Sequence, residues 1–262
     1  MSDEPRNILE HIEELRKRIV RILISVAGIT VFVFVFAIKP FTLGEMTIPL
    51  PFPDVSGNIA AQMIESVESY VLPKYVKLVV TAPSQAFLAQ MYASIFLGVV
   101  LSTPVIAREI AAFVSPGLYE NEKRTIRNII VPTTVLFIAG CIFGYLFVVP
   151  FSFDFLYGYA VAIGAQTFIT LDELISFVVL FVVAFGISFE LPVIMWVLSA
   201  IGIVDAKFWR NNWRYSAVGI VIFGAVITPD GSGITMWFVA LPMMALYLAG
   251  YLVIRRRKKP TA

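Results

Sequence analysis

The chain has 262 residues, of which 59% are hydrophobic and 15% are charged, and its formal net charge is +2 at pH 7. Soluble domains average about 45–50% apolar and about 25% charged residues, so this apolar excess cannot be buried in one globular core. The composition therefore predicts a membrane protein that crosses the bilayer several times, and it argues against a soluble enzyme, a nucleic-acid-binding protein or a disordered chain.

Seven stretches of the chain carry almost no charged residue. They cover residues 22–38, 78–107, 128–153, 155–171, 174–204, 215–229 and 231–254, and only Glu190 interrupts the fifth. A helix needs about 20 apolar residues to cross a hydrocarbon core of roughly 30 Å. The first, second, third and fifth stretches are therefore long enough to span a membrane, while the fourth is ambiguous and the last two need further support.

The positions of the basic residues provide that support. Most Lys and Arg residues fall in four clusters, at 6–21, 108–127, 207–214 and 255–259. Because basic loops stay on the cytoplasmic side, neighbouring clusters must be separated by an even number of crossings. Two crossings fit each gap, which predicts an all-α fold of six transmembrane helices with both termini in the cytoplasm. A seventh crossing at 155–171 would move a cluster outside, so this stretch is predicted to be an outer loop.

We expect a single membrane domain over residues 1–262. Residues 1–18 form its cytoplasmic N-terminal segment, 40–86 a long extracytoplasmic loop, and 255–262 a basic cytoplasmic tail. The long loop opens with a proline-rich stretch, and an amphipathic helical pattern follows from about Ile59 to Leu72.

Several of the predicted helices carry an internal proline, and two are expected to be short. The second, third, fourth and sixth spans contain Pro104, Pro132, Pro192 and Pro242. Kinked helices can splay around a concave groove, although membrane helices also tolerate proline without such a role. The fifth span, 215–228, is about 21 Å long at 1.5 Å per residue, which is shorter than the hydrocarbon core. The fifth and sixth helices are therefore predicted to form a short pair, unless Trp209 and Trp213 extend the fifth.

Glu190 is the charged residue that lies inside a predicted span. A charge at mid-helix costs about 2.5–3.5 kcal/mol on insertion scales, so its carboxyl is expected to face protein or water. Two interpretations stay open: a polar contact inside a pocket, or a protonated carboxyl bonded to a neighbouring helix. Pro192 leaves the carbonyl of Ser188 without its helical donor, which adds an acceptor near the same depth.

Signatures of catalysis and of metal binding are almost absent from the sequence. His11 is the only histidine, and neither an HExxH nor a P-loop motif occurs. A zinc site of the usual kind lacks ligands. We therefore expect a protein that is no enzyme, with no catalytic residue, metal or cofactor. Cys141, Gly140 and Gly144 are predicted to serve packing, because small residues four positions apart let helices approach closely.

The first two predicted cytoplasmic segments carry acids next to their bases. Glu13 and Glu14 precede Lys17 and Arg18 by four positions, a spacing that supports ion pairs on a solvated helix. A second interpretation is a pair of carboxylates, one from each segment, that binds a cationic ligand. Carboxylates suit a guanidinium group because its planar fork donates two parallel hydrogen bonds.

Four motifs in chain order carry a resemblance to a known family. They read HIEELRKR at 11–18, STPV at 102–105 followed by FVSPGLYENEKR at 113–124, FGISFELP at 185–192, and TPD at 228–230. Together they resemble the TatC family, the core subunit of the twin-arginine protein translocase. The motifs extend over nearly the whole chain and fit the six-span plan with both termini inside.

This resemblance implies a receptor that exports folded proteins across the cytoplasmic membrane and uses the protonmotive force. Glu14 and Glu122 match the carboxylates that receive the paired arginines of a signal peptide. Glu190 matches the buried carboxyl of the family's groove, and Asp230 matches the acidic end of its fifth helix. The neighbouring recognition surface corresponds to Arg16, Phe113, Leu118 and Tyr119. The implied partners are twin-arginine signal peptides of folded cargo, TatA-type and often TatB-type single-span subunits, the lipid bilayer and further copies of the chain, with no nucleic acid.

An alternative from another class is an ion-coupled transporter of a small solute, with Glu190 as its coupling site. Inverted repeats or paired broken helices would support this alternative. Neither is evident in the sequence.

Overall fold

The computed structural model describes residues 8–43, 46–114, 128–228 and 233–256. The chain forms two compact units, one from Met1–Met63 with Gln90–Thr134 and the other from Ile64–Ala89 with Val135–Ala262. The single membrane domain expected over the whole chain stays a prediction.

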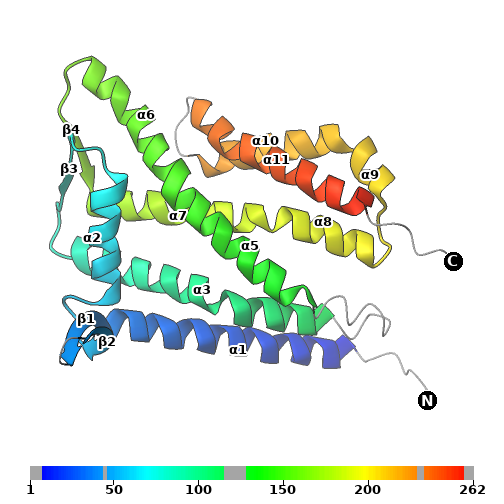
Figure 1. Ribbon diagram of the computed structural model, residues 1–262, viewed down its shortest axis with the longest axis horizontal. Coiled ribbons are helices and arrows are strands. Elements are labelled where there is room, and N and C mark those ends of the chain that lie inside the picture. Colours follow the sequence, from blue (N-terminus) through cyan, green and yellow to red (C-terminus); the bar gives the residue numbers. More distant parts are fainter. Residues whose placement is uncertain (1–7, 44–45, 115–127, 229–232, 257–262) are drawn as a thin grey trace. The chain divides into compact units, whose positions relative to one another are not determined.

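The first unit is built on two antiparallel helices, α1 (Ile8–Val35) and the part of α3 (Gln85–Val114) that begins at Gln90. Figure 1 shows the two helices side by side over much of their length. Alanine in place of Gly98 would bring its Cβ to 3.0 Å from the carbonyl oxygen of Val26, so the two backbones approach closely only because Gly98 has no side chain. Polar contacts join the helices at two further levels, Ser25 with Ser102 at 3.2 Å and Arg18 with Glu109 at 3.3 Å.

A β-hairpin follows α1 without a spacer and uses the proline-rich stretch. It consists of β1 (Phe36–Leu43) and β2 (Met46–Pro53), and its register places Pro40 opposite Pro49. Proline has no N–H, so Pro40 and Pro49 form a non-hydrogen-bonded pair of the antiparallel ladder. Non-hydrogen-bonded pairs alternate with hydrogen-bonded ones, so Pro51 and Pro53, two and four residues further along β2, also lie in non-hydrogen-bonded pairs.

All four prolines thus stand where an N–H would point away from the partner strand, and the ladder loses no hydrogen bond. Strands were not predicted for this stretch, because composition alone does not reveal that prolines on two strands occupy equivalent alternating positions. The hairpin is a local addition to a chain that is otherwise mainly helical, as predicted.

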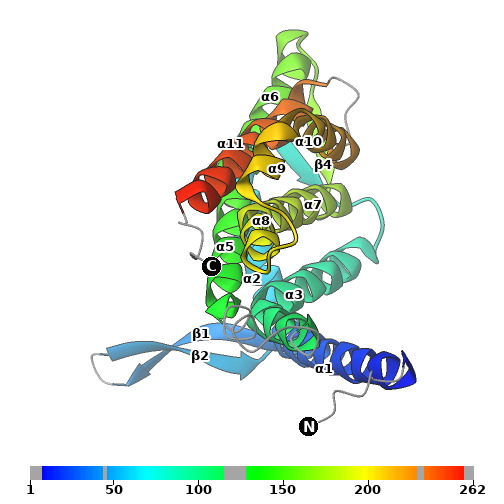
Figure 2. The same cartoon turned by 90° about the vertical axis from the view of Figure 1, so that its right-hand side faces the viewer.

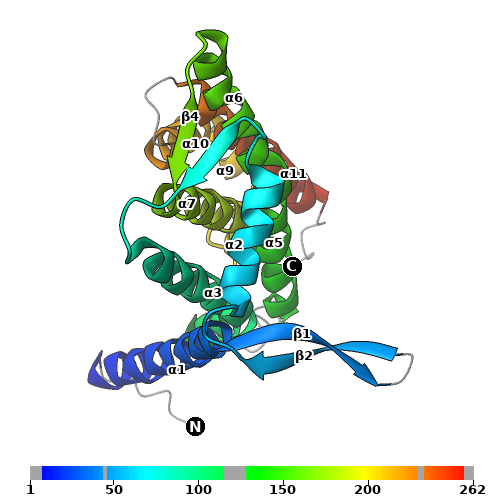
Figure 3. The ribbon, with the colours of Figure 1, turned by 90° about the vertical axis from the view of Figure 1, so that its left-hand side faces the viewer.

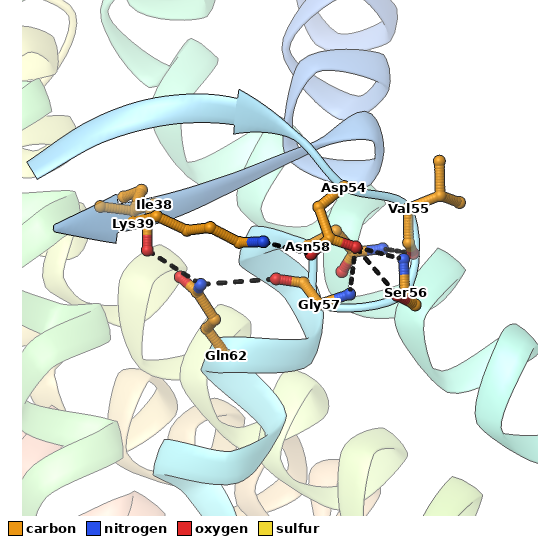
Figure 4. Close-up of polar contacts among 8 residues, drawn as sticks. All are labelled: Ile38, Lys39, Asp54, Val55, Ser56, Gly57, Asn58 and Gln62. Carbon is orange, nitrogen blue, oxygen red and sulfur yellow. Dashed lines mark hydrogen bonds and ion pairs between the residues drawn. The ribbon is translucent and has the colours of Figure 1, made fainter. Parts of the chain in front are cut away.

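The base of the hairpin is fixed by a network of polar contacts, drawn in Figure 4. Lys39 Nζ lies 2.8 Å from Asp54 Oδ2, and Asp54 Oδ1 accepts hydrogen bonds from the backbone N–H groups of Ser56 and Gly57. The ammonium group and these donors hold the pKa of the Asp54 carboxyl well below its usual range. Asn58, which is fully buried, donates to the carbonyl oxygens of Val55 and Phe34 and so ties the turn to the end of α1.

The second unit has α7 (Leu171–Phe189) at its centre. Its buried face contains Leu174, Ile175, Val178, Phe181 and Phe185, all with no exposed surface. Packed against it is a long helical run made of α5 (Ile130–Phe143), the π-helical turn η2 (Gly144–Val148) and α6 (Val149–Ala162), of which residues from Val135 belong to this unit.

Glycine permits this packing. Alanine at Gly140 would bring its Cβ to 2.5 Å from the carbonyl oxygen of Phe185, and alanine at Gly186 would bring its Cβ to 2.9 Å from Cys141 Sγ. The predicted packing roles of Gly140, Gly144 and Cys141 are confirmed, because Gly144 also contacts Phe185 and Cys141 is buried.

One end of the second unit carries α2 (Ile59–Val71), of which residues from Ile64 belong to it, and two short parallel strands. The strands are β3 (Val76–Val79) and β4 (Thr167–Thr170), visible in Figure 3. Tyr70 stacks on Tyr145 of η2 at 5.5 Å between ring centroids, and the Tyr70 hydroxyl donates to the carbonyl oxygen of Leu146. The amphipathic helix expected at 59–72 is confirmed with almost the predicted bounds.

The remaining helices of the second unit are α8 (Leu191–Ala200), α9 (Ala206–Asn211), α10 (Trp213–Ile227) and α11 (Ile234–Arg256). Gly250 of α11 packs on Pro192 and Met195 of α8, while Gly224 of α10 packs on Met236 of α11.

The predicted spans are recovered as helices, with two corrections. Within the described ranges, five helical runs are long and apolar enough to cross a membrane, and α10 is a shorter apolar helix of 15 residues. The sixth helix is not short, since α11 has 23 residues. The stretch 155–171 is not a loop throughout, because α6 continues to Ala162 before β4 begins at Thr167. The third helical run is longer than predicted because its apolar residues continue through η2 into α6.

Candidate functional site

A cluster of charged side chains joins the N-terminal part of α1 to the C-terminal part of α3. Arg18 contacts the carboxylate of Glu14 on its own helix, and its Nη1 donates to Glu109 Oε2 at 3.3 Å. Arg21 Nη1 donates to the same oxygen of Glu109, also at 3.3 Å. Glu109 is 4% exposed, so its negative charge is compensated by two arginines rather than by water.

Glu109 was not among the residues singled out from the sequence. Its neighbour Arg108 made it part of an ordinary basic segment, and a carboxylate next to a base is common at the end of a membrane helix. The signal that could have found it is its position on the same helix face as Ser102, seven residues away, which is the face turned to α1.

Two aromatic rings lie at the same end of the helix pair. His11 of α1 stacks on Phe113 of α3, with ring centroids 4.5 Å apart and an interplanar angle of 19°. Phe113 is half-buried and Arg16 is exposed. The structure therefore brings Glu14 and Phe113 to one end of the α1–α3 pair, and their expected binding role stays a prediction.

The adjacent residue Glu13 has a different environment from Glu14. Glu13 Oε1 lies 2.9 Å from Lys17 Nζ, and both side chains are well exposed. Lys17 lowers the pKa of the Glu13 carboxyl through this contact. The predicted spacing of ion pairs four positions apart is confirmed for both Glu13 and Glu14, but only Glu14 is joined through Arg18 to a buried carboxylate of α3.

Four of the candidate site residues lie outside the described residues. They are Leu118, Tyr119, Glu122 and Asp230.

Glu190 stands at a break between helices rather than inside one. It follows the last residue of α7 and precedes the first residue of α8. The N–H of Glu190 donates to the carbonyl oxygen of Ile187 at 3.0 Å, and the carbonyl oxygen of Glu190 accepts from the N–H of Ile194. Pro192 stands in the first turn of α8, where a missing N–H breaks no helical bond. Glu190 is half-buried and its Oε1 atom is shielded from solvent. The role of its carboxyl as a polar site inside the membrane stays a prediction.

An apolar pocket of about 360 Å³ opens between α9, α10 and α11 of the second unit. Trp209 fixes one wall, because its Nε1 donates to Ser199 Oγ at 2.9 Å and its carbonyl oxygen accepts from the Tyr247 hydroxyl at 2.7 Å. The lining residues are Trp209, Arg210, Trp213, Ala217, Ile220, Met244, Tyr247, Leu248 and Tyr251. The pocket is distinct from the charged cluster, which belongs to the first unit.

Among the residues that the structure describes, no group of three or more His, Cys, Asp or Glu side chains is arranged to hold a metal ion. The chemistry available at the charged cluster is ion pairing and charge-assisted hydrogen bonding.

The sequence of this chain is similar to those of a known protein family. Residues 10–242 match the family described as "Sec-independent protein translocase protein (TatC)". The chain is 46% identical over 250 residues to the Sec-independent protein translocase protein TatC of Cenarchaeum symbiosum, covering 95% of each chain. It is 33% identical to the TatC protein of Deinococcus radiodurans, over 95% of this chain and 85% of the relative.

A solved structure agrees with these relatives. It is titled as a crystal structure of the twin-arginine translocase receptor TatC, and it superposes with a TM-score of 0.74 at 26% identity, over 94% of this chain and 98% of that chain. The apolar helices of the described residues and the sequence match together identify a component of a protein translocase rather than an enzyme, and a protein that crosses the membrane several times. The chain belongs to the TatC family of Sec-independent protein translocase proteins.

Proposed function

We propose that this chain is the signal-peptide receptor and core subunit of a twin-arginine translocase, which exports folded proteins across the cytoplasmic membrane. In this proposal, Glu14 and Glu122 receive the two arginines of the signal peptide. Export is driven by the protonmotive force. The assignment of the family supports a translocase, and it does not support the alternative of a small-solute transporter.

The observation that carries the proposal is the position of Arg18 between Glu14 and Glu109. The two terminal nitrogens of the Arg18 guanidinium contact different carboxylates, Nη2 that of Glu14 and Nη1 that of Glu109. A guanidinium group of the signal peptide can therefore replace Arg18 at Glu14 while Arg18 keeps its bond to Glu109. Such an exchange replaces one charge-assisted contact by another and leaves no buried charge uncompensated. The side chain of Glu14 is 24% exposed, which makes it accessible from solvent, whereas that of Glu109 is 5% exposed.

The residues around Glu14 supply the rest of the proposed recognition surface. Phe113, stacked on His11, offers an aromatic face at the same end of the α1–α3 pair, and Leu118, Tyr119 and Arg16 are the other residues assigned to this surface. A hydrophobic segment of the signal peptide would follow a groove that contains Glu190. Asp230 would mark the end of the fifth helix.

The proposed membrane arrangement has both termini in the cytoplasm. The segments 1–18 and 255–262 and the loop with Glu122 then lie on the side from which cargo arrives, in agreement with their content of Lys and Arg. TatA-type and TatB-type single-span subunits and further copies of the chain are the proposed partners in the assembled complex.

Glu13 provides a matched control for a binding experiment. Glu13→Gln and Glu14→Gln each remove one negative charge from adjacent positions of the same helix, so their long-range electrostatic effects are alike. Affinity of purified protein for a labelled twin-arginine peptide should fall at least about tenfold, or ~1.4 kcal/mol, for Glu14→Gln and for Glu122→Gln, and change little for Glu13→Gln. Salt concentration must be matched, since exposed charges are screened.

Peptide variants test the same contact from the ligand side. A peptide with two lysines in place of the arginines should bind more weakly to the unsubstituted protein, because an ammonium group cannot form the bidentate pair. The difference between the two peptides should shrink in Glu14→Gln. Equal effects of Glu13→Gln and Glu14→Gln, or equal affinity for both peptides, would refute the proposed role.

A further inference from the structure

The two faces of the β1–β2 hairpin differ in character. Residues directly opposite each other in an antiparallel pair project from the same face, so Phe41 with Ile48, Lys39 with Leu50, and Ala37 with Phe52 share one face. The ring centroids of Phe41 and Phe52 are 6.2 Å apart, which agrees with this placement. We call Phe41, Ile48, Leu50 and Phe52 the apolar face of the hairpin.

The apolar face is exposed within the chain. The four side chains are 40%, 45%, 38% and 37% exposed, although they are large and hydrophobic. The opposite face carries four prolines, at 40, 49, 51 and 53, together with Phe36, Ile38 and Thr42. A cluster of four large apolar side chains on one face requires an apolar partner outside the hairpin.

The edges of the hairpin are closed to a further strand. The outward-pointing positions of β2 include Pro49, Pro51 and Pro53, which have no N–H to donate to another chain. On β1, the carbonyl oxygen of Ile38 is already bonded to Gln62 Nε2 at 3.1 Å. A partner that adds a β-strand, such as the same hairpin of a second copy, is therefore disfavoured.

The hairpin begins where a membrane span ends. β1 starts at Phe36, the residue after Val35, and the N–H of Asp54 returns from β2 to the carbonyl oxygen of Val35 at 2.9 Å. The hairpin thus has no spacer that could carry it away from the bilayer surface. Figures 1 and 2 show it leaving the end of α1 sideways instead of continuing along the helix axis.

Continuity with the lipid-facing surface of α1 identifies the occupant. α1 has exposed apolar side chains along its length, including Leu23, Ile24, Val31 and Phe32, and it is a candidate span with little surface buried by other elements. Phe32 of α1 stacks on Phe36 at the start of β1, with ring centroids 4.8 Å apart, so the apolar surface of the helix runs on into the hairpin. Lys39, a charged residue on the same face, is neutralised by Asp54 at the base of the hairpin.

We propose that the hairpin is a membrane-surface anchor whose apolar face inserts into the headgroup–acyl boundary of the leaflet in which α1 ends. The ligand is the lipid surface itself, recognised through apolar side chains and without a specific headgroup. The polar network at Asp54 and Asn58 transmits this attachment to the end of α1, because it fixes the hairpin to Val35 and Phe34. This role is separate from signal-peptide binding.

Spin labels at alternating positions test the proposal. Single cysteines are introduced at Phe41 or Leu50 on the apolar face, and at Ile38 or Thr42 on the opposite face, in a Cys141→Ala background. The labelled full-length protein is reconstituted into vesicles of phosphatidylcholine and phosphatidylglycerol, and collision rates are measured with oxygen and with a water-soluble nickel chelate. Helical content and elution volume confirm that each variant is folded.

Labels on the apolar face should collide several-fold more with oxygen than with nickel, and labels on the opposite face should show the reverse. Ile48→Asp should make a label at Leu50 accessible to nickel, whereas the matched substitution Thr42→Asp should leave that label unchanged. Equal nickel accessibility on both faces would overturn the proposal. So would exclusion of both reagents from the apolar face with spin–spin broadening that disappears on dilution with unlabelled protein, since a second copy would then cover that face.

Discussion

Arg18 and Glu109 are 91 positions apart in the sequence, yet Arg18 Nη1 lies 3.3 Å from Glu109 Oε2. This contact places a buried carboxylate of α3 behind the arginine that also holds Glu14. The charged end of the α1–α3 pair is therefore a connected network rather than a set of independent surface charges.

Removal of the buried carboxylate should loosen this network. Glu109→Gln leaves Arg18, whose side chain is 16% exposed, without a compensating charge from α3, while the more exposed Arg21 can turn to solvent. We expect the free energy of unfolding in detergent to fall by about 1.5–3 kcal/mol, the range for hydrogen bonds to charged groups. Glu13→Gln should change it by only a few tenths of a kcal/mol, because the Glu13–Lys17 pair is exposed. Equal losses in the two variants would show that burial of Glu109 contributes nothing.

A methyl group at Gly140 should disturb the packing between α5 and α7. Its Cβ would lie 2.5 Å from the carbonyl oxygen of Phe185 and 2.9 Å from the side chain of Phe189, so the helices must separate. Gly140→Ala should destabilise the protein by about 1–3 kcal/mol, measured by thermal or denaturant unfolding in detergent. Gly158→Ala in α6 is the matched control, since nothing lies within 4 Å of its added Cβ and alanine favours a helix. Loss of stability in both variants would contradict a specific close approach.

Acidification should release the base of the hairpin. The pKa of Asp54 is lowered by Lys39 and by backbone and side-chain donors of Gly57 and Ser56, so its carboxylate contributes stability above its ordinary value of 3.8. That contribution is lost as the pH falls from this value through the lower pKa of the folded state. A spin label at Thr42 should therefore become more mobile over this acidic window.

Asp54→Asn is the control for this transition. Its label should show no step in mobility over the same window, because the side chain at position 54 no longer titrates. A step of equal size in Asp54→Asn would assign the transition to another group.

The hydroxyl of Tyr247 should stabilise the position of α9. It donates at 2.7 Å to the carbonyl oxygen of Trp209, which α9 carries, while Trp209 Nε1 is bonded to Ser199. Tyr247→Phe removes the first of these bonds and should lower the free energy of unfolding by about 1 kcal/mol. Tyr251→Phe, at another position in the pocket lining, should have a smaller effect. An unchanged stability in Tyr247→Phe would mean that water replaces the lost donor.

The sequence by itself determined the approximate positions of the apolar helices. Charge-free stretches mark where a chain can cross hydrocarbon, and the clusters of Lys and Arg separate the crossings, so α1, α3, α7 with α8, α10 and α11 fall where they were predicted. Contacts within one helix were equally accessible, and the pairing of Glu13 with Lys17 and of Glu14 with Arg18 follows from spacing alone. The order of four motifs was enough to suggest the family.

Only the tertiary structure decided which distant residues meet. Glu109 gains its importance from two arginines on another helix, and Gly140 from the carbonyl of Phe185, and no local pattern carries that information. The β-hairpin depends on a register that places all four prolines in non-hydrogen-bonded pairs. The interruption between α7 and α8 at Glu190 depends on a backbone turn, which a hydropathy pattern does not reveal. Crossing a membrane is governed by the transfer of each residue from water to lipid, which composition reports, whereas pairing and packing depend on the three-dimensional placement of partners that lie far apart in the chain.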